Sequence, residues 1–208
     1  MLQSLMQHRP LMISSIMEFA ERWYPDVEVV SRTTEGPIHR YTYKDMGSRT
    51  RRLASCLSTL GIKQGDRVAT LAWNGYRHLE LYYGVSGSGA VLHTINPRLF
   101  AEQMAFVIND AEDKVIFTDL TFVPLLEGLK DKIPGVAQFV IMTDRDHMPD
   151  TSLDNVHCYE ELLDHGNENF QWPDFDETAP SSMCYTSGTT GNPKGCLLYT
   201  SPSPRDRG

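Results

Sequence analysis

Hydrophobic residues recur along this chain with two different periods, and the order of these periods predicts the order of its helices and strands. The first helical pattern starts at Ser15-Ile16-Met17-Glu18, which has the form of a capping box, and Pro25 ends it. Two β-rich segments, 27–32 and 38–42, then flank Gly36-Pro37. Because Gly-Pro is typical of a turn, we interpret them as an antiparallel hairpin.

A second capped helix is predicted to begin at Thr42-Tyr43-Lys44-Asp45 and to end at Gly61. Beyond it, strand and helix patterns alternate. The strands are expected at 67–72, 90–95, 114–118 and 139–142, and the helices at 76–87, 100–110 and 122–130. This alternation predicts right-handed βαβ crossovers, so we expect an α/β fold in which a mainly parallel sheet is flanked by helices on both faces.

The alternation is interrupted by the segment 144–176, which is acidic and rich in turn residues. We interpret it as a surface excursion with one short helix near 159–163. A short strand-like run, 182–185, follows and leads into the stretch from Tyr185 to Gly195. A loop after a strand is where α/β folds usually bind phosphates, so this stretch is the main candidate for chemistry.

The stretch has the composition of a phosphate-binding loop. Its glycines let the backbone approach an anion, its hydroxyls donate hydrogen bonds, and its lysine adds positive charge. It is not the common P-loop, because Pro193 precedes the lysine and Gly195 follows it. A flexible linker is the alternative, but a linker needs neither a lysine nor a fixed order. The candidate binding residues are Thr186, Ser187, Gly188, Thr189, Thr190, Gly191 and Lys194.

Composition and charge exclude several classes of partner and location for this chain. The 208 residues carry a net charge of −8, and the basic residues are scattered, so we expect no nucleic-acid footprint. No apolar run is long enough to span a bilayer, and the first ten residues lack the pattern of a signal peptide. The four cysteines show no metal-ligand spacing. We therefore expect a cytoplasmic protein with reduced thiols and no metal site of its own.

The loop resembles the phosphate-binding signature of the adenylate-forming superfamily, which contains acyl-CoA and aryl-CoA synthetases, luciferases and peptide-synthetase adenylation domains. Residues 41–46, 60–68 and 87–99 are similar to further blocks of this superfamily and follow in its order. Asn96-Pro97-Arg98-Leu99 resembles acyl-CoA synthetases in particular. The resemblance implies that residues 1–195 form part of the large N-terminal AMP-binding domain. It is strongest toward short- and medium-chain fatty-acyl-CoA synthetases, including the methylthiopropionate-CoA ligase type.

The resemblance also implies an activity. Such enzymes join a small-molecule carboxylate to ATP as an acyl-adenylate and then transfer the acyl group to coenzyme A, with Mg²⁺ bound at the phosphates. The loop residues and Lys194 would hold the departing pyrophosphate. The superfamily's magnesium motif, adenine site, acyl pocket and catalytic lid follow this loop in the sequence, so we expect no catalytic residue in this chain and no activity from it alone.

Other functions stay open at this point. A non-enzymatic nucleotide- or phosphate-binding module would also carry such a loop. Aryl-CoA ligases and peptide-synthetase adenylation domains are alternatives within the superfamily.

The segment from Cys196 to Gly208 has a separate interpretation. Its residues up to Asp206 match, codon by codon, the translation of a transposase-type sequencing-library adaptor. We therefore predict that 196–208 is a non-native tail and that residues 1–195 are the native part of a truncated open reading frame.

Several conspicuous side chains have structural interpretations. His93 is expected to be a packed core group rather than a base, because it lies in an apolar strand. Trp73, Tyr82 and Tyr83 are expected in the core rather than in a substrate wall. Asn96-Pro97 is interpreted first as a loop breaker.

Overall fold

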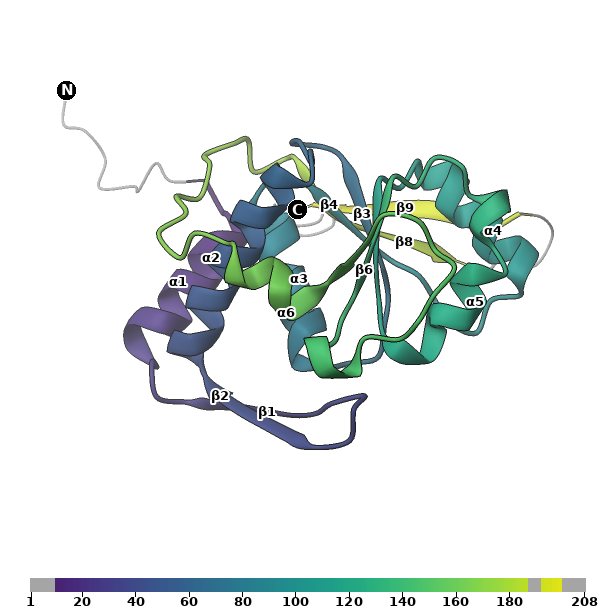
Figure 1. Cartoon of the computed structure of the whole chain (residues 1–208). Helices are drawn as coiled ribbons and strands as arrows, with labels where there is room; N and C mark the ends of the chain where they lie inside the picture. Colours follow the sequence, from purple (N-terminus) through teal and green to yellow (C-terminus); the bar gives the residue numbers. More distant parts are fainter. Residues whose placement is uncertain (1–9, 187–191, 200–208) are drawn as a thin grey trace, which may run out of the picture.

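The computed structural model describes residues 10–186 and 192–199, which form two sheets and the helices around them (Figure 1). The strands of the larger sheet are β3 (Arg67–Leu71), β4 (Val91–Thr94), β5 (Val115–Thr118), β6 (Gln138–Ile141), β7 (Val156–Cys158), β8 (Pro180–Thr186) and β9 (Lys194–Tyr199). The helices are α1 (Ile13–Trp23), α2 (Tyr43–Thr59), α3 (Tyr76–Gly87), α4 (Ala101–Ala111), α5 (Val123–Glu127) and α6 (Tyr159–Asp164). Strands β1 (Glu28–Arg32) and β2 (Ile38–Thr42) form the predicted antiparallel hairpin.

The seven-stranded sheet has the order β7-β6-β5-β3-β4-β8-β9. All neighbouring strands are parallel except β8 and β9, which are antiparallel. The chain therefore leaves β3 toward β4, crosses back to β5, and continues outward to β6 and β7. This reversal places a topological switch point between β3 and β5, a position where open α/β sheets commonly bind ligands. The predicted mainly parallel fold is confirmed.

Two apolar cores cover the two faces of the sheet, and Figure 1 shows α4 and α5 on one side and α2, α3 and α6 on the other. Successive side chains of the central strands pack into opposite cores, because side chains alternate between the two faces of a pleated strand. In β5, Ile116 packs with Met104 and Leu126, whereas its neighbour Phe117 packs with Leu81. The near-continuous apolar strands reflect this burial on both faces.

A third, smaller cluster joins α1 and the hairpin to the rest of the fold. Its buried members are Met17, Tyr41, Met46 and Tyr76. Thr42 caps α2 as predicted: its hydroxyl accepts a hydrogen bond from the Asp45 backbone N–H at 3.2 Å, and the Asp45 carboxylate accepts one from the Thr42 N–H at 2.9 Å.

Three expectations about secondary structure were wrong. Helix α1 begins at Ile13, so Ser15 lies inside its first turn, where its hydroxyl donates to the Met12 carbonyl at 2.6 Å instead of capping the helix. The segment 144–176 contains the edge strand β7, which is too short to produce a visible alternation. Strand β9 was not expected, because it lies largely in the segment interpreted as a tail.

A network of buried charges connects the helices of one face. Glu80 of α3 is fully buried and accepts hydrogen bonds from Arg49 at 2.7 Å and from the Tyr159 hydroxyl at 2.7 Å. Arg49 also donates to Glu160 at 2.9 Å, and Glu160 accepts from Arg77 at 2.8 Å. The network thus joins α2, α3 and α6 through paired charges, which is how proteins accommodate buried ionic groups.

Candidate functional site

The predicted phosphate loop begins where β8 ends, at the carboxyl edge of the parallel strands. Thr186 is the last residue of β8, and its partner across the antiparallel pair is Lys194, the first residue of β9. Directly opposed residues on neighbouring strands place their side chains on the same face. The structure therefore brings a hydroxyl and a cation together at the base of the loop. Ser187, Gly188, Thr189, Thr190 and Gly191 lie outside the described residues, so their role stays a prediction.

Tyr185, immediately before Thr186, is anchored to the sheet and to α4. Its hydroxyl donates to Asp110 at 2.7 Å, and its ring centroid lies 5.2 Å from that of His93. His93 in turn is hydrogen-bonded through Nδ1 to the buried Asp113 at 2.7 Å. Burial raises the pKa of the Tyr185 hydroxyl, and the acceptor Asp110 raises it further. This arrangement fixes the strand from which the loop starts.

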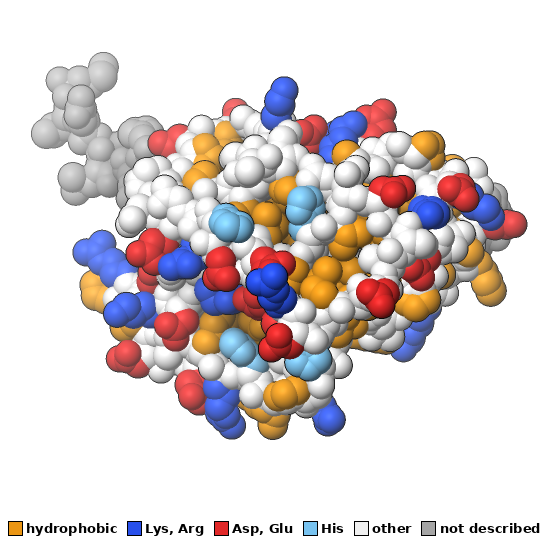
Figure 2. Space-filling view, in the orientation of Figure 1, with side chains coloured by type: hydrophobic (Ala, Val, Ile, Leu, Met, Phe, Trp, Pro, Cys, Tyr) orange, Lys and Arg blue, Asp and Glu red, His pale blue; other side chains and the backbone are white. Residues whose placement is uncertain are grey.

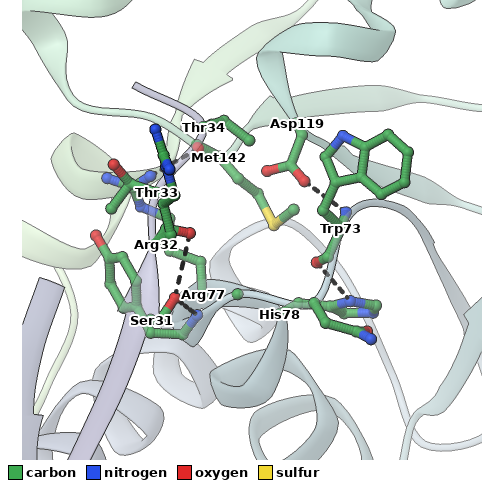
Figure 3. Close-up of a pocket in the computed structure, with 12 residues that line it drawn as sticks. Ser31, Arg32, Thr33, Thr34, Trp73, Arg77, His78, Asp119 and Met142 are labelled. Carbon is green, nitrogen blue, oxygen red and sulfur yellow. Dashed lines mark hydrogen bonds between the residues drawn. The ribbon is translucent and has the colours of Figure 1, made fainter. Parts of the chain in front are cut away.

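A second polar site lies at the switch point between β3 and β5 (Figure 3). Asp119 follows β5 directly, and one of its carboxylate oxygens accepts a hydrogen bond from the Trp73 backbone N–H at 2.6 Å. The Trp73 carbonyl accepts from His78 Nδ1 at 3.2 Å, which places the proton of a neutral ring on that nitrogen. His78 Nε2 lies 3.0 Å from the Thr70 hydroxyl.

Burial shifts the ionisation of this second site. It raises the pKa of Asp119 to about 6, and the Trp73 N–H opposes the rise. Burial also lowers the pKa of His78, although its bond to the Trp73 carbonyl opposes this. Both groups therefore favour their uncharged forms more than exposed side chains do.

The hairpin covers this switch point from one side, and Figure 3 shows its residues facing Trp73 and His78 across the cavity. Glu35, beyond β1, accepts from Arg77 and from the Thr143 hydroxyl, both at 2.8 Å. The Ser31 hydroxyl accepts from the first backbone N–H of α3, that of Tyr76, at 3.1 Å. Burial alone would raise the pKa of Glu35, but its hydrogen bonds and Arg77 lower it overall. The cavity that remains is about 30 Å³, roughly the space of one water molecule.

The conspicuous aromatic residues are arranged differently from the expectation. Trp73 and Tyr82 are 50% and 43% exposed, so the prediction that they lie in the core was wrong. Tyr83 is half-buried against the third cluster, and His93 is fully buried as predicted. The Trp73 ring makes a tilted contact with the ring of Phe122, with centroids 5.1 Å apart.

The sequence analysis did not predict a site formed by Asp119, Trp73 and His78. Asp119 could have been noticed as an acidic residue directly after a buried strand, but its contact with Trp73 exists only because β3 and β5 are neighbours in the sheet. Among the described residues, no group of three His, Cys, Asp or Glu side chains could hold a metal ion. Within the same ranges, every helix is too short or too polar to cross a membrane.

The fold and the loop strands together define a class: an α/β domain with a mainly parallel sheet, whose predicted phosphate loop starts at the carboxyl edge of that sheet. Residues 17–201 match the model of the AMP-binding enzyme family, and the chain therefore belongs to that family. The match runs six residues past Gly195, and the predicted tail boundary at that residue stays a prediction.

The relatives are ligases. Over 192 residues the chain is 47% identical to 3-methylmercaptopropionyl-CoA ligase of Ruegeria pomeroyi and 48% identical to medium-chain-fatty-acid–CoA ligase of Ectopseudomonas oleovorans. These alignments cover 92% of this chain but only 36% and 35% of the two relatives, so the chain spans about a third of their length.

The fold also matches a solved structure. The anthranilate CoA ligase AuaEII in complex with anthranoyl-AMP superposes with a TM-score of 0.79 at 19% identity, over 92% of this chain and 36% of that one. At this level of identity the match supports the fold alone.

Proposed function

We propose that this chain is the N-terminal part of an ATP-dependent acid–thiol ligase, which activates a short- or medium-chain fatty carboxylate as an acyl-adenylate and transfers it to coenzyme A. The observation that carries the proposal is the 47–48% identity to two CoA ligases, combined with Thr186 and Lys194 at the base of the loop. We also propose a cytoplasmic location for the protein.

In this proposal, the chain contributes phosphate binding to the reaction. ATP would supply the α-phosphate that the carboxylate attacks, with Mg²⁺ at the phosphate oxygens. Lys194 makes no ion pair with any described residue, so its ammonium is available as a point charge for the leaving pyrophosphate. Thr186 and the hydroxyls of Ser187, Thr189 and Thr190 would donate hydrogen bonds, while Gly188 and Gly191 would let the backbone approach.

The test is a chimera in which residues 17–195 of this chain replace the aligned part of the Ruegeria pomeroyi ligase. We expect acyl-CoA formation from ATP, coenzyme A and a panel of carboxylates, measured by free-thiol consumption. Lys194→Ala in the chimera should lower the rate at least ~100-fold, since one lost electrostatic contact to the developing charge typically costs that much. Lys114→Ala, which removes an exposed lysine outside the loop, is the matched control.

Two outcomes would contradict the proposal. One is a folded chimera, with the circular dichroism of the parent ligase, that activates no carboxylate. The other is a Lys194→Ala chimera as active as its control. Separately, measurable ATP–pyrophosphate exchange by the isolated 208-residue chain would contradict the expectation that it is inactive alone.

A further inference from the structure

One tyrosine contacts both strands that hold the predicted phosphate loop. Tyr185 of β8 lies directly before Thr186, and its partner across the antiparallel pair is Gly195 of β9. The next pair along, Thr186 and Lys194, forms the base of the loop. A contact between the side chain of Tyr185 and the backbone of Gly195 therefore bears directly on the distance between the two strands at that base.

The ring of Tyr185 lies over Gly195. A Cβ atom on Gly195 would stand 3.2 Å from the ring carbon that carries the hydroxyl, and 2.6 Å from the methyl carbon of Met183. The φ of Gly195 is outside the left-handed region, so the glycine is required for space rather than for backbone conformation. An aromatic side chain that covers a glycine on the neighbouring strand supplies the cross-strand packing that the glycine lacks. The ring thus packs β9 against β8.

The end of α4 supports the same ring from the other side. Asp110, in the last turn of α4, accepts the hydrogen bond from the Tyr185 hydroxyl at 2.7 Å. Asp113, just beyond the helix, is hydrogen-bonded at 2.7 Å to His93, whose ring contacts that of Tyr185. Asp113 and His93 are both fully buried, so neither can move without disturbing the core.

These two carboxylates lie where a helix disfavours them. The C-terminus of a helix carries a partial negative charge, and the last turn of α4 contains no basic residue. Burial adds to the cost, because it raises the pKa of Asp113. Arg67 of β3 offsets part of this by donating to the Ala111 carbonyl, which also anchors the helix end to the centre of the sheet. Residues that break a local rule in this way are typical of functional sites.

We propose that Tyr185 is a positioning residue for the phosphate loop. Its ring, held by Asp110 and His93, fixes the separation of the two strands and with it the relative position of Thr186 and Lys194. The kinetic consequence rests on the proposed function, because these are the groups that would hold the departing pyrophosphate. A misplacement of about 1 Å at such groups can cost on the order of 100-fold in rate.

The kinetic test uses the ligase chimera and replaces the ring by an aliphatic side chain. Tyr185→Leu should raise the KM for ATP about tenfold and lower kcat, while the KM for the carboxylate stays within about twofold. Tyr185→Phe keeps the ring over Gly195 and should restore the KM for ATP to within about threefold of the unsubstituted chimera. Tyr24→Leu removes an exposed tyrosine far from the loop and is the matched control.

A second variant acts from the opposite strand. Gly195→Ala places a methyl group against the Tyr185 ring, so the KM for ATP should rise, by about threefold. Leu125→Ala shows what a purely structural loss does, since Leu125 packs on the same face of the sheet as Tyr185. It should lower the unfolding midpoint and leave the KM for ATP unchanged.

Hydrogen exchange in the 208-residue chain tests the positioning without the reaction. Tyr185→Leu should accelerate exchange in peptides from β8 and β9 about tenfold and leave peptides from β3 and β5 unchanged. An unsubstituted chimera that forms no acyl-CoA would contradict the proposed function. The exchange measurement would still decide whether Tyr185 holds the two strands.

Three results would overturn the inference. The first is exchange in Tyr185→Leu that matches exchange in Tyr24→Leu. The second is a Tyr185→Leu chimera with a lower unfolding midpoint but an unchanged KM for ATP, which would make Tyr185 a packing residue only. The third is a Tyr185→Phe chimera as impaired as Tyr185→Leu, which would assign the effect to the hydroxyl rather than to the ring.

Discussion

The two faces of the central sheet are stabilised in different ways. The face under α4 and α5 is packed by aliphatic and aromatic side chains, such as Met104, Ile116 and Leu126, and its one described buried polar pair is that of His93 and Asp113. The face under α2, α3 and α6 also has an apolar core, but above it lies the network of Arg49, Glu80 and their partners. Figure 2 shows acidic and basic side chains intermixed over the region of α1, α2 and α6.

The difference teaches which contacts a periodic pattern can predict. Apolar packing can be predicted from the spacing of residues within one element, because the hydrophobic effect is non-directional and needs no specific partner. A buried ion pair requires specific partners from separate elements, and its net stabilisation is small unless a partner is removed. The ionic face should therefore be sensitive to single charge deletions, and the apolar face to lost volume.

Deletion of the central carboxylate should have the largest effect. Glu80→Ala leaves Arg49 without its closest partner in a buried position, so we expect a loss of about 3–5 kcal/mol in the free energy of unfolding. Urea denaturation followed by circular dichroism measures it. Glu28→Ala removes an exposed ion pair with Arg40 and should cost less than about 1 kcal/mol. Equal losses in the two variants would show that burial does not distinguish these pairs.

A volume deletion on the apolar face should come next. Leu126→Ala removes a fully buried side chain of α5 and should cost about 3 kcal/mol, through lost burial and the cavity left behind. The half-buried neighbour Leu125 provides the control, because Leu125→Ala should cost clearly less. The Leu126→Ala loss should also be the same at pH 5 and pH 8. A pH-dependent loss would mean that titratable groups contribute to the packing around Leu126.

The switch point adds a titrating group between the two faces. Burial raises the pKa of Asp119 from 3.8 to about 6, so the folded chain holds this proton more tightly than the unfolded chain does. The free energy of unfolding therefore decreases as pH rises from 4 to 6, by on the order of 2–3 kcal/mol, and stays lower above that window.

Asp119→Asn should remove this decrease while keeping an acceptor for the Trp73 N–H. Urea denaturation at pH 4, 5, 6 and 7 measures the slope. The charges that face Asp119 are those of Arg77 and Glu35, and both remain in the variant. Asp176→Asn, at an exposed turn, is the control and should leave the slope between pH 4 and 6 in place. A slope in Asp119→Asn as steep as in the original chain would assign it to other groups.

Loss of a helix cap should have the smallest effect. Thr42→Ala leaves the Asp45 N–H of α2 without its side-chain acceptor and should cost about 1 kcal/mol. Thermal unfolding with Thr59→Ala, at the exposed end of the same helix, provides the matched comparison. A Thr42→Ala chain as stable as Thr59→Ala would mean that α2 is held by its packing and charge network alone.

Much of the fold could be predicted because the crossover elements have strong periodic patterns. Helix α3 occurs at the predicted residues 76–87, and β5 begins only one residue after its predicted start. Strand β7 has three residues in a polar segment, so no period was available to reveal it. The predicted start of α1 was wrong because a serine can either cap a helix or lie inside its first turn, and Ser15 does the second.

The candidate site was less predictable than the fold. Thr186 and Lys194 were found because an ordered motif contains both. Asp119, Trp73 and His78 carry no motif, and their approach depends on β3 and β5 becoming neighbours after α4 has crossed the sheet. The burial of Glu80 could not be predicted from the sequence either, since a charged residue in a helical pattern is usually exposed.

The position of β8 has a consequence for the order of folding. Its partner β4 is far away in the sequence, with Leu92 opposite Ser182, whereas β3, β4, β5 and β6 are joined by much shorter connections. Closing the longer loop costs more chain entropy before any contact repays it. We therefore predict that β8, the strand that leads into the predicted phosphate loop, docks late, onto a sheet already formed by the earlier crossovers. In native-state hydrogen exchange, its amides should be released before those of β3 and β5.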